Sequence, residues 1–186
     1  FLELPGSIME ETMPLELPPR LTHLEIPRQL LTLKRLQTLP HLLKLHLVNA
    51  SDRLPTAYDP MVDLEWARAL PSGLKRLHAS QWKGDPKTLQ AWIAALPKSL
   101  LDLAIDLDYG TRKELEKNVD KDAAKRWVVW PPHLLSLSLH LPTYDAATIF
   151  ASLPRGLVNL ELSTLVETNV TGNDIKLLPP MLRQVA

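Results

Sequence analysis

Leu-Pro, once replaced by Trp-Pro, recurs along this chain and each time leads into a Leu-rich run. Seven such runs align with a mean spacing of about 27 residues, although the individual spacings differ. They are LPPRLTHLEI from Leu17, LPHLLKLHL from Leu39, LPSGLKRLHA from Leu70, LPKSLLDLAI from Leu96, WPPHLLSLSL from Trp130, LPRGLVNLEL from Leu153 and LPPMLRQVA from Leu178. A period of this length predicts stacked units that share one core, and it disfavours an ordinary α/β domain with Leu-rich strands.

The central part of each copy follows the pattern L-x-x-L-x-L, as in Leu157, Leu160 and Leu162. Its last four residues alternate with a period of two, which sends the Leu side chains to one face and the intervening side chains to the other. This pattern predicts a short strand in each copy. Strands from successive units should lie side by side in parallel, because the chain returns to the same end of the sheet before each one.

The segments between the strands carry helix signals. Asp59-Pro60 and Asp85-Pro86 each combine an N-cap residue with Pro at the first helical position. Thr111–Glu114 form a capping box, and Thr143 can cap a further helix. A shorter helix is expected over residues 28–38. Each unit should therefore run from strand through loop and helix to a Pro-containing turn.

The L-x-x-L-x-L motif, repeated after L-P-x-x, resembles the leucine-rich repeat family, and the resemblance covers essentially the whole chain. The helical returns are similar to the intracellular, ribonuclease-inhibitor-like class, and the Leu-Pro lead-in is similar to FNIP-type and bacterial effector repeats. The resemblance implies an α/β leucine-rich-repeat solenoid of about seven to eight irregular repeats. It also implies a curved parallel sheet on the concave side, with helices or irregular returns on the convex side.

The chain departs from the family pattern after each strand. The family usually places Asn or Cys three residues after the last Leu of the motif, where the side chain bonds the turning backbone. The corresponding residues here are Gln29, Ala50, Trp82, Asp108, Pro142 and Leu165. Irregular loops are therefore expected after the strands. Both ends read as strands without a polar cap, which predicts a single leucine-rich-repeat domain over residues 1–186 that is a segment of a longer protein.

Composition argues against several classes of function. The six Gly are too widely spaced for a phosphate-cradling loop, and no GxSxG or HExxH motif occurs. A formal net charge of zero argues against a nucleic-acid partner, and no apolar run is long enough to span a membrane. We therefore expect neither catalysis nor a cofactor. The lack of Cys, and of a signal peptide in this segment, favours an intracellular location.

In a stacked parallel sheet the residues between the Leu positions face solvent on the concave side. The partner-binding candidates on this face are His23, Glu25, Lys44, His46, Arg76, His78, Asp102, Asp106, Ser136, Ser138, Asn159 and Glu161. The N-terminal half of this face is basic around Lys44 and Arg76, the centre is acidic, and the C-terminal half is small and neutral. Tyr58 and Trp82 are expected on the rim, where exposed aromatic side chains often anchor partners.

Three functions stay open on the sequence alone. The first is a protein–protein interaction module that binds a protein through the concave face, which the resemblance extends to the recognition part of a larger ligase-type or signalling protein. The second is a metal-dependent enzyme that uses Asp102, Asp106, His46 and His78. The third is a structural spacer without a partner. The extended polar face favours the first function, with acidic partner residues meeting the basic half.

Overall fold

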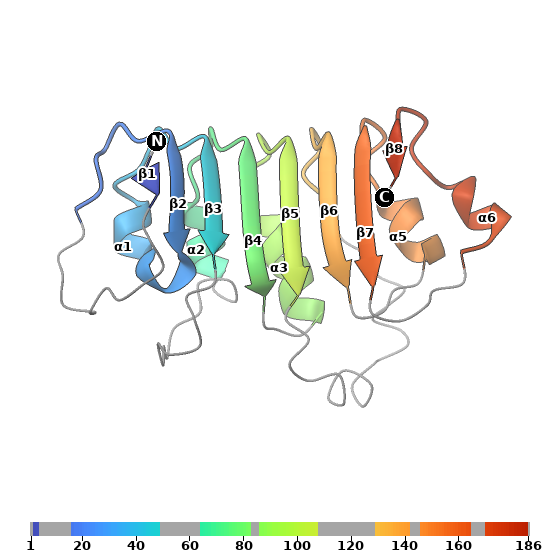
Figure 1. Ribbon diagram of the computed structural model, residues 1–186, viewed down its shortest axis with the longest axis horizontal. Coiled ribbons are helices and arrows are strands. Elements are labelled where there is room, and N and C mark those ends of the chain that lie inside the picture. The colour runs from blue at the N-terminus through green and yellow to red at the C-terminus, as the bar shows by residue number, and fades with distance from the viewer. Residues whose placement is uncertain are drawn as a thin grey trace.

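The computed structural model describes residues 2–3, 16–48, 64–82, 86–107, 129–141, 146–164 and 170–185. These residues form one sheet of eight parallel strands, and the strand order in space follows the sequence (Figure 1). The strands are β1 (Leu2–Glu3), β2 (His23–Pro27), β3 (Lys44–Val48), β4 (Arg76–Trp82), β5 (Asp102–Leu107), β6 (Ser136–Leu141), β7 (Asn159–Thr164) and β8 (Gln184–Val185). The predicted parallel sheet of an α/β leucine-rich-repeat solenoid is confirmed.

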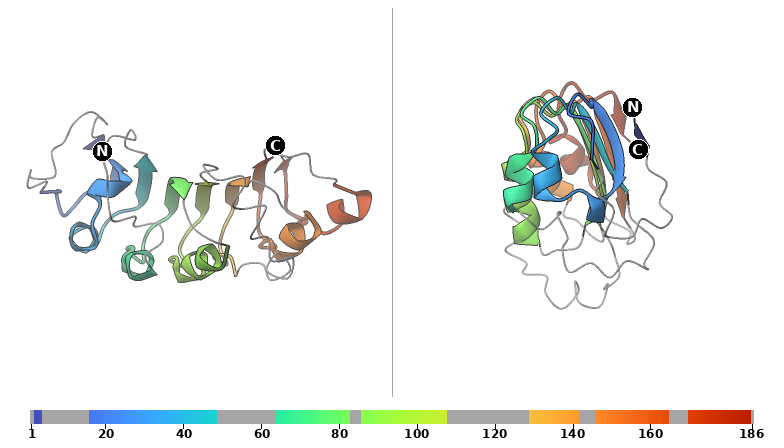
Figure 2. Two further views of the ribbon diagram at one scale, coloured as in Figure 1. Left: turned by 90° about the horizontal axis from the view of Figure 1, so that it is seen from below. Right: turned by 90° about the vertical axis from the view of Figure 1, so that its left-hand side faces the viewer.

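Short helices return the chain from the end of one strand to the start of the next. They are η1 (Arg28–Leu30), α1 (Leu33–Leu36), α2 (Leu64–Ala69), α3 (Pro86–Ala95), α5 (Ala146–Ser152) and α6 (Gly172–Ile175). Figure 2 shows α1, α2, α3 and α5 on one side of the sheet, and the row of strands bends so that the opposite side lies inside a shallow arc. The sheet therefore has one covered face and one open face.

The register of the sheet follows the repeat. Equivalent positions of successive copies are Cα partners, as Lys44 and Arg76 are across β3 and β4. The same correspondence holds from β1 to β8, with a shift in the β4–β5 pair between Ala79 and Trp82. This register places equivalent outward side chains in rows that run across the strands, because neighbouring strands lie about 4.8 Å apart.

The Leu-Pro or Trp-Pro lead-in forms a tight turn ahead of each strand from β2 to β8. In most copies the amide of the Leu three residues after Pro donates to the Pro carbonyl, as Leu74 does to Pro71 at 2.9 Å. The second copy is one residue shorter after its Pro, and there Leu42 donates to the carbonyl of Leu39 at 3.2 Å. Pro40 consequently moves one place along the turn. The turn absorbs the missing residue, and β3 keeps its register with its neighbours.

The return segments confirm most of the expected helices and correct one. Pro86 is the first residue of α3, as predicted. Residues 28–38 do not form a single helix, because Thr32 is extended at ψ 159° and separates η1 from α1. The Thr32 hydroxyl accepts a hydrogen bond from the amide of Arg35 at 3.4 Å and so caps α1. The helix expected from Thr111 lies outside the described residues, as do the caps expected for α2, α3 and α5.

The Leu side chains of the repeat fill the space between the sheet and the helices. The second Leu of the motif is at most 3% exposed in Leu24, Leu45, Leu77, Leu103, Leu137 and Leu160. Burial of each such side chain contributes about 1.5–3 kcal/mol to folding. Trp66 and Trp92 are also fully buried, and Nε1 of Trp66 donates to the Leu31 carbonyl at 3.0 Å. In the last strand the equivalent residue, Val185, is 57% exposed.

Candidate functional site

The open side of the sheet, which we call the strand face, is built from the residues that alternate with the buried Leu side chains. The first row, at the strand starts, is His23, Lys44, Arg76, Asp102, Ser136, Asn159 and Gln184. The second row is Glu25, His46, His78, Ala104, Ser138 and Glu161, and the third includes Asp106, His140 and Ser163. All the candidates predicted for this face lie in these rows, and their role in binding stays a prediction.

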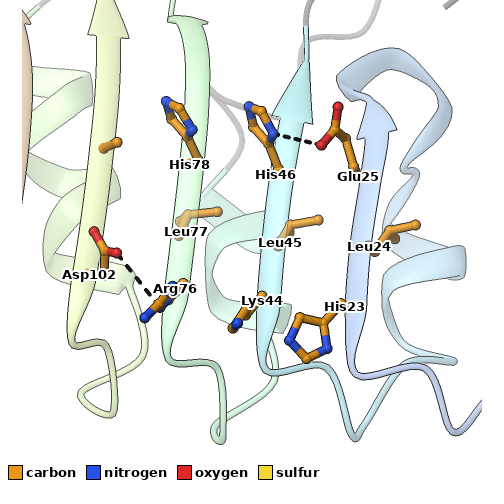
Figure 3. Close-up of a pocket in the computed structure, with 11 residues that line it drawn as sticks. His23, Leu24, Glu25, Lys44, Leu45, His46, Arg76, Leu77, His78 and Asp102 are labelled. Carbon is orange, nitrogen blue, oxygen red and sulfur yellow. Dashed lines mark hydrogen bonds and ion pairs between the residues drawn. The ribbon is translucent and has the colours of Figure 1, made fainter. Parts of the chain in front are cut away.

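A cavity of about 290 Å³ opens on the strand face over β2–β5. The residues that line it are His23, Leu24, Glu25, Lys44, Leu45, His46, Arg76, Leu77, His78, Asp102 and Ala104. Figure 3 shows the first-row side chains at one level of the strands and the second-row side chains at the next. The cavity therefore coincides with the basic half of the face and with its border to the acidic centre.

The first row of the cavity is electropositive. Lys44 is exposed, and its ammonium group makes no hydrogen bond or ion pair with another described residue. On one side of it, Nδ1 of His23 lies 2.9 Å from the hydroxyl of Thr22. Partial desolvation lowers the pKa of His23 most, followed by the positive charges of Lys44, of the chain N-terminus and of Arg76. The cations of β3 and β4 therefore extend their field over β2.

Arg76 is tied to the acidic centre of the face. Its Nε atom lies 3.8 Å from Oδ2 of Asp102 on the neighbouring strand, and the two side chains are 60% and 40% exposed. An ion pair this exposed contributes little to stability, typically about 0–1 kcal/mol. Its structural effect is to orient the guanidinium group along the first row, and four of the five N–H donors of that group are not used by this contact. Arg76 therefore remains able to bind a further anion.

The second row carries two stacked histidines. The rings of His46 and His78 lie parallel, with centroids 4.4 Å apart and planes 6° from each other. Nδ1 of His46 donates to Oε2 of Glu25 at 3.1 Å, and this hydrogen bond fixes the orientation of the His46 ring. Partial burial, and next the neighbouring His46, lower the pKa of His78, although Asp102 and Asp106 oppose that change. The surroundings of His78 therefore disfavour protonation of its ring.

The C-terminal half of the strand face has shorter and mostly uncharged side chains. The Ser138 hydroxyl donates to Oε2 of Glu161 at 2.9 Å, so the only acid of this half in the second row is already bound to a neighbour within the described part of the chain. In the third row a 2.6 Å hydrogen bond joins Oγ of Ser163 and Nδ1 of His140. These four side chains bond one another, and this part of the face carries no Lys or Arg in the described rows.

The residues named for a metal-dependent enzyme share the strand face but do not converge. His46 and His78 come together, yet their rings stack face to face, so the nitrogen lone pairs lie in parallel planes. Asp102 lies beside Arg76 in the first row, and Asp106 is the Cα partner of His140 in the third. Within the described part of the chain, no three or more His, Asp or Glu side chains lie close enough together to hold a metal ion. No observation favours this alternative.

An apolar strip at the strand starts was not among the predicted residues. Leu43 and Leu135 are 40% and 45% exposed, and Leu101 and Val158 are partly exposed. The amide of Leu135 donates to the carbonyl of Leu101 at 2.8 Å, and the amide of Val158 donates to that of Leu135 at 2.8 Å, so these three are lateral neighbours. The signal was an extra apolar residue directly after the first Leu of the motif, in Leu42-Leu43, Leu100-Leu101, Leu134-Leu135 and Leu157-Val158.

The predicted rim aromatics remain predictions. Tyr58 lies outside the described residues. Trp82 is the last residue of β4, where its backbone is paired with Leu107, but its side chain lies outside the described part of the structure.

A search of the described helices for one of sufficient length and hydrophobicity to span a membrane finds none.

Comparison with known proteins finds similarity in structure and none in sequence. No protein-family model matches the chain. No curated protein sequence matches it either. The crystal structure of the leucine-rich repeat-containing protein LegL7 from Legionella pneumophila superposes with a TM-score of 0.57 over 88% of this chain, at 15% sequence identity. The chain spans 55% of the length of that protein. The similarity establishes that this chain has a leucine-rich-repeat fold.

Proposed function

We propose that this chain is a protein-interaction module that binds a protein partner through the strand face. One observation carries the proposal: the cavity on the open side of the sheet is lined by a free Lys44, an oriented Arg76 and the stacked histidines. An unpaired charge such as Lys44, beside an Arg76 that keeps unused donors, is what a partner of opposite charge can bind. The similarity to a leucine-rich-repeat protein supports the class of function.

The finer proposals concern the kind of module. The helical returns α2, α3 and α5, together with the Leu-Pro turns, support a ribonuclease-inhibitor-like or FNIP-like repeat class within a single domain. The resemblance suggests that such a domain acts as the recognition part of a larger ligase-type or signalling protein. In either case the partner surface should be acidic where it meets Lys44 and Arg76.

Site-specific photo-crosslinking in an extract of the source organism tests the proposed face. A benzophenone amino acid is placed at Ala104, on the strand face, or at Ala91, which is exposed on α3. We expect adducts of defined mass from position 104 and none of the same proteins from position 91. The charge-reversed double variant Lys44→Glu/Arg76→Glu should lose these adducts, because it replaces attraction by repulsion.

The matched control reverses two exposed charges on the helical side, Lys34→Glu on α1 and Arg68→Glu on α2. This variant should retain the adducts from position 104. Adducts that survive Lys44→Glu/Arg76→Glu, or that disappear equally in the control, would show that the strand face is not the binding surface. Absence of any specific adduct at either position would favour a structural spacer.

A further inference from the structure

We propose that the partner presents a phosphate monoester, carried on a phosphoserine or phosphothreonine side chain, and that Lys44 and Arg76 hold this group between them. The inference rests on the proposed function, because it takes the ligand to be a segment of a protein bound on the strand face. It adds the chemistry that the basic half of that face selects.

The spacing of the two cations suits one compact anion. Lys44 and Arg76 are Cα partners on adjacent strands, and strands in a sheet lie about 4.8 Å apart. A phosphate group offers three acceptor oxygens and a charge between about −1.5 and −2 near neutral pH, so it can accept from both side chains at once. Arginine also binds phosphate through pairs of parallel N–H donors. Asp102 already offsets part of the charge of Arg76, so what favours phosphate over a carboxylate is its three acceptor oxygens, which Lys44 and the unused Arg76 donors can share.

Two carboxylates on either side favour a compact anion over a run of acidic residues. Asp102 continues the first row beyond Arg76, and Glu25 lies in the second row on β2, where it is bound to His46. A partner with several acids in succession would bring some of them close to these carboxylates, and like charges repel. A single compact group between Lys44 and Arg76 lies away from Glu25, and the carboxylate close to it, Asp102, is paired with Arg76.

The surface beside the cations changes from charged to apolar toward β7. Leu101, Leu135 and Val158 lie at successive strand starts, next to the first row, and Leu135 is 45% exposed. A partner segment that crosses the strands from β4 toward β7 would therefore place apolar side chains on this strip. We infer a segment with one phosphorylated residue and apolar residues near it, rather than a uniformly acidic segment.

Binding of peptide libraries to the full chain tests this inference. Three fluorescent libraries of short peptides differ only in the fixed central residue, which is phosphoserine, Ser or Glu. Fluorescence polarisation should show that the phosphoserine library binds about tenfold more tightly than the Ser library, the size expected of one strong charge-assisted contact. The Glu library should bind less tightly than the phosphoserine library. Equal binding of the phosphoserine and Ser libraries would overturn the inference.

Variants locate the binding group. Lys44→Gln and Arg76→Gln should each remove most of the tenfold preference, whereas Lys34→Gln on α1 should retain it; circular dichroism confirms that each variant is folded. Retention of the preference in both strand-face variants would overturn the assignment to Lys44 and Arg76. A titration with inorganic phosphate separates the sources of the anion, because binding as tight as that of the phosphoserine library would mean a site for free phosphate.

The outcomes also separate this inference from the function on which it rests. Suppose that crosslinking from position 104 depends on Lys44 and Arg76, but the phosphoserine library binds no more tightly than the Ser library. The proposed interaction module would then stand, and the proposal of a phosphorylated partner would be rejected. Loss of dependence on the strand face in the crosslinking experiment would reject the module itself.

Discussion

Over β2–β4 the strand face carries Lys44, Arg76 and the stacked pair His46 and His78, whereas over β6 and β7 the equivalent positions hold Ser, Asn and one Glu. The two halves share the same strand pairing, the same turns before the strands and the same buried Leu positions. The difference is confined to side chains that point away from the core. Fold and recognition are therefore encoded by alternate residues of the same strands.

The comparison has a thermodynamic side. Burial of apolar surface is the main favourable term in folding, and both halves bury the second Leu of the motif almost completely. Outward side chains such as Lys44 keep their hydration and make few contacts, so they can differ between the halves at little cost. Charge on the strand face can therefore be arranged for a partner without loss of stability.

The largest expected effect tests whether the two halves share one core. Leu77→Ala in β4 and Leu137→Ala in β6 should each lower the free energy of unfolding by about 2–5 kcal/mol, because both remove a fully buried side chain. Val185→Ala in β8 should cost less than about 1 kcal/mol, since Val185 is 57% exposed. Urea denaturation measures all three. A much smaller cost for Leu137→Ala than for Leu77→Ala would show that the C-terminal half is more loosely packed.

A smaller effect should separate the halves by pH. The pKa of His78 is lowered below its ordinary value of 6.5 by partial burial and then by His46, so the folded protein binds this proton less readily than the unfolded chain. Above about pH 6.5 the ring is neutral in both states, so it does not reduce the free energy of unfolding. As the pH falls from 6.5 toward the folded-state pKa, the unfolded chain binds the proton first, and the free energy of unfolding decreases. The urea midpoint should therefore fall on acidification.

Matched variants assign that pH dependence. His78→Gln should flatten the fall of the urea midpoint below about pH 6.5, because it removes the titrating ring. Ser138→Ala, at the equivalent position of β6, should leave the slope unchanged since it removes no titrating group. An unchanged slope in His78→Gln would assign the acid sensitivity to another group and weaken the contrast between the halves.

Much of this architecture could be predicted from the sequence, because the repeat recurs along the chain and places Leu at the same positions within each copy. The alternation within L-x-x-L-x-L sets which side chains are buried, and parallel stacking then sets the lateral neighbours. Pairing of His46 with His78 follows from those two facts alone. The return segments were less predictable, since Thr32 can either continue a helix or cap one, and its extended backbone splits residues 28–38.

The details of the candidate site depended on geometry that a pattern does not contain. The register brings His46 beside both Glu25 and His78, but only side-chain torsions decide that it bonds the first and stacks on the second. The apolar strip was overlooked for a related reason. If the period of two were continued back from the buried Leu137, Leu135 would lie on the core side. The turn before the strand breaks this alternation, so Leu134 is buried and Leu135 is exposed.

The smallest expected effect is the change in the free energy of unfolding when a Lys and Arg pair is introduced into the neutral half. Ser136 and Asn159 are Cα partners in the first row of β6 and β7, as Lys44 and Arg76 are in β3 and β4. The variant Ser136→Lys/Asn159→Arg should change the free energy of unfolding by less than about 0.5 kcal/mol, because both side chains point away from the core. Urea denaturation beside the parent chain measures the change. A loss above about 1 kcal/mol would mean that the outward rows are coupled to packing, and that Lys44 and Arg76 serve the fold as well as the face.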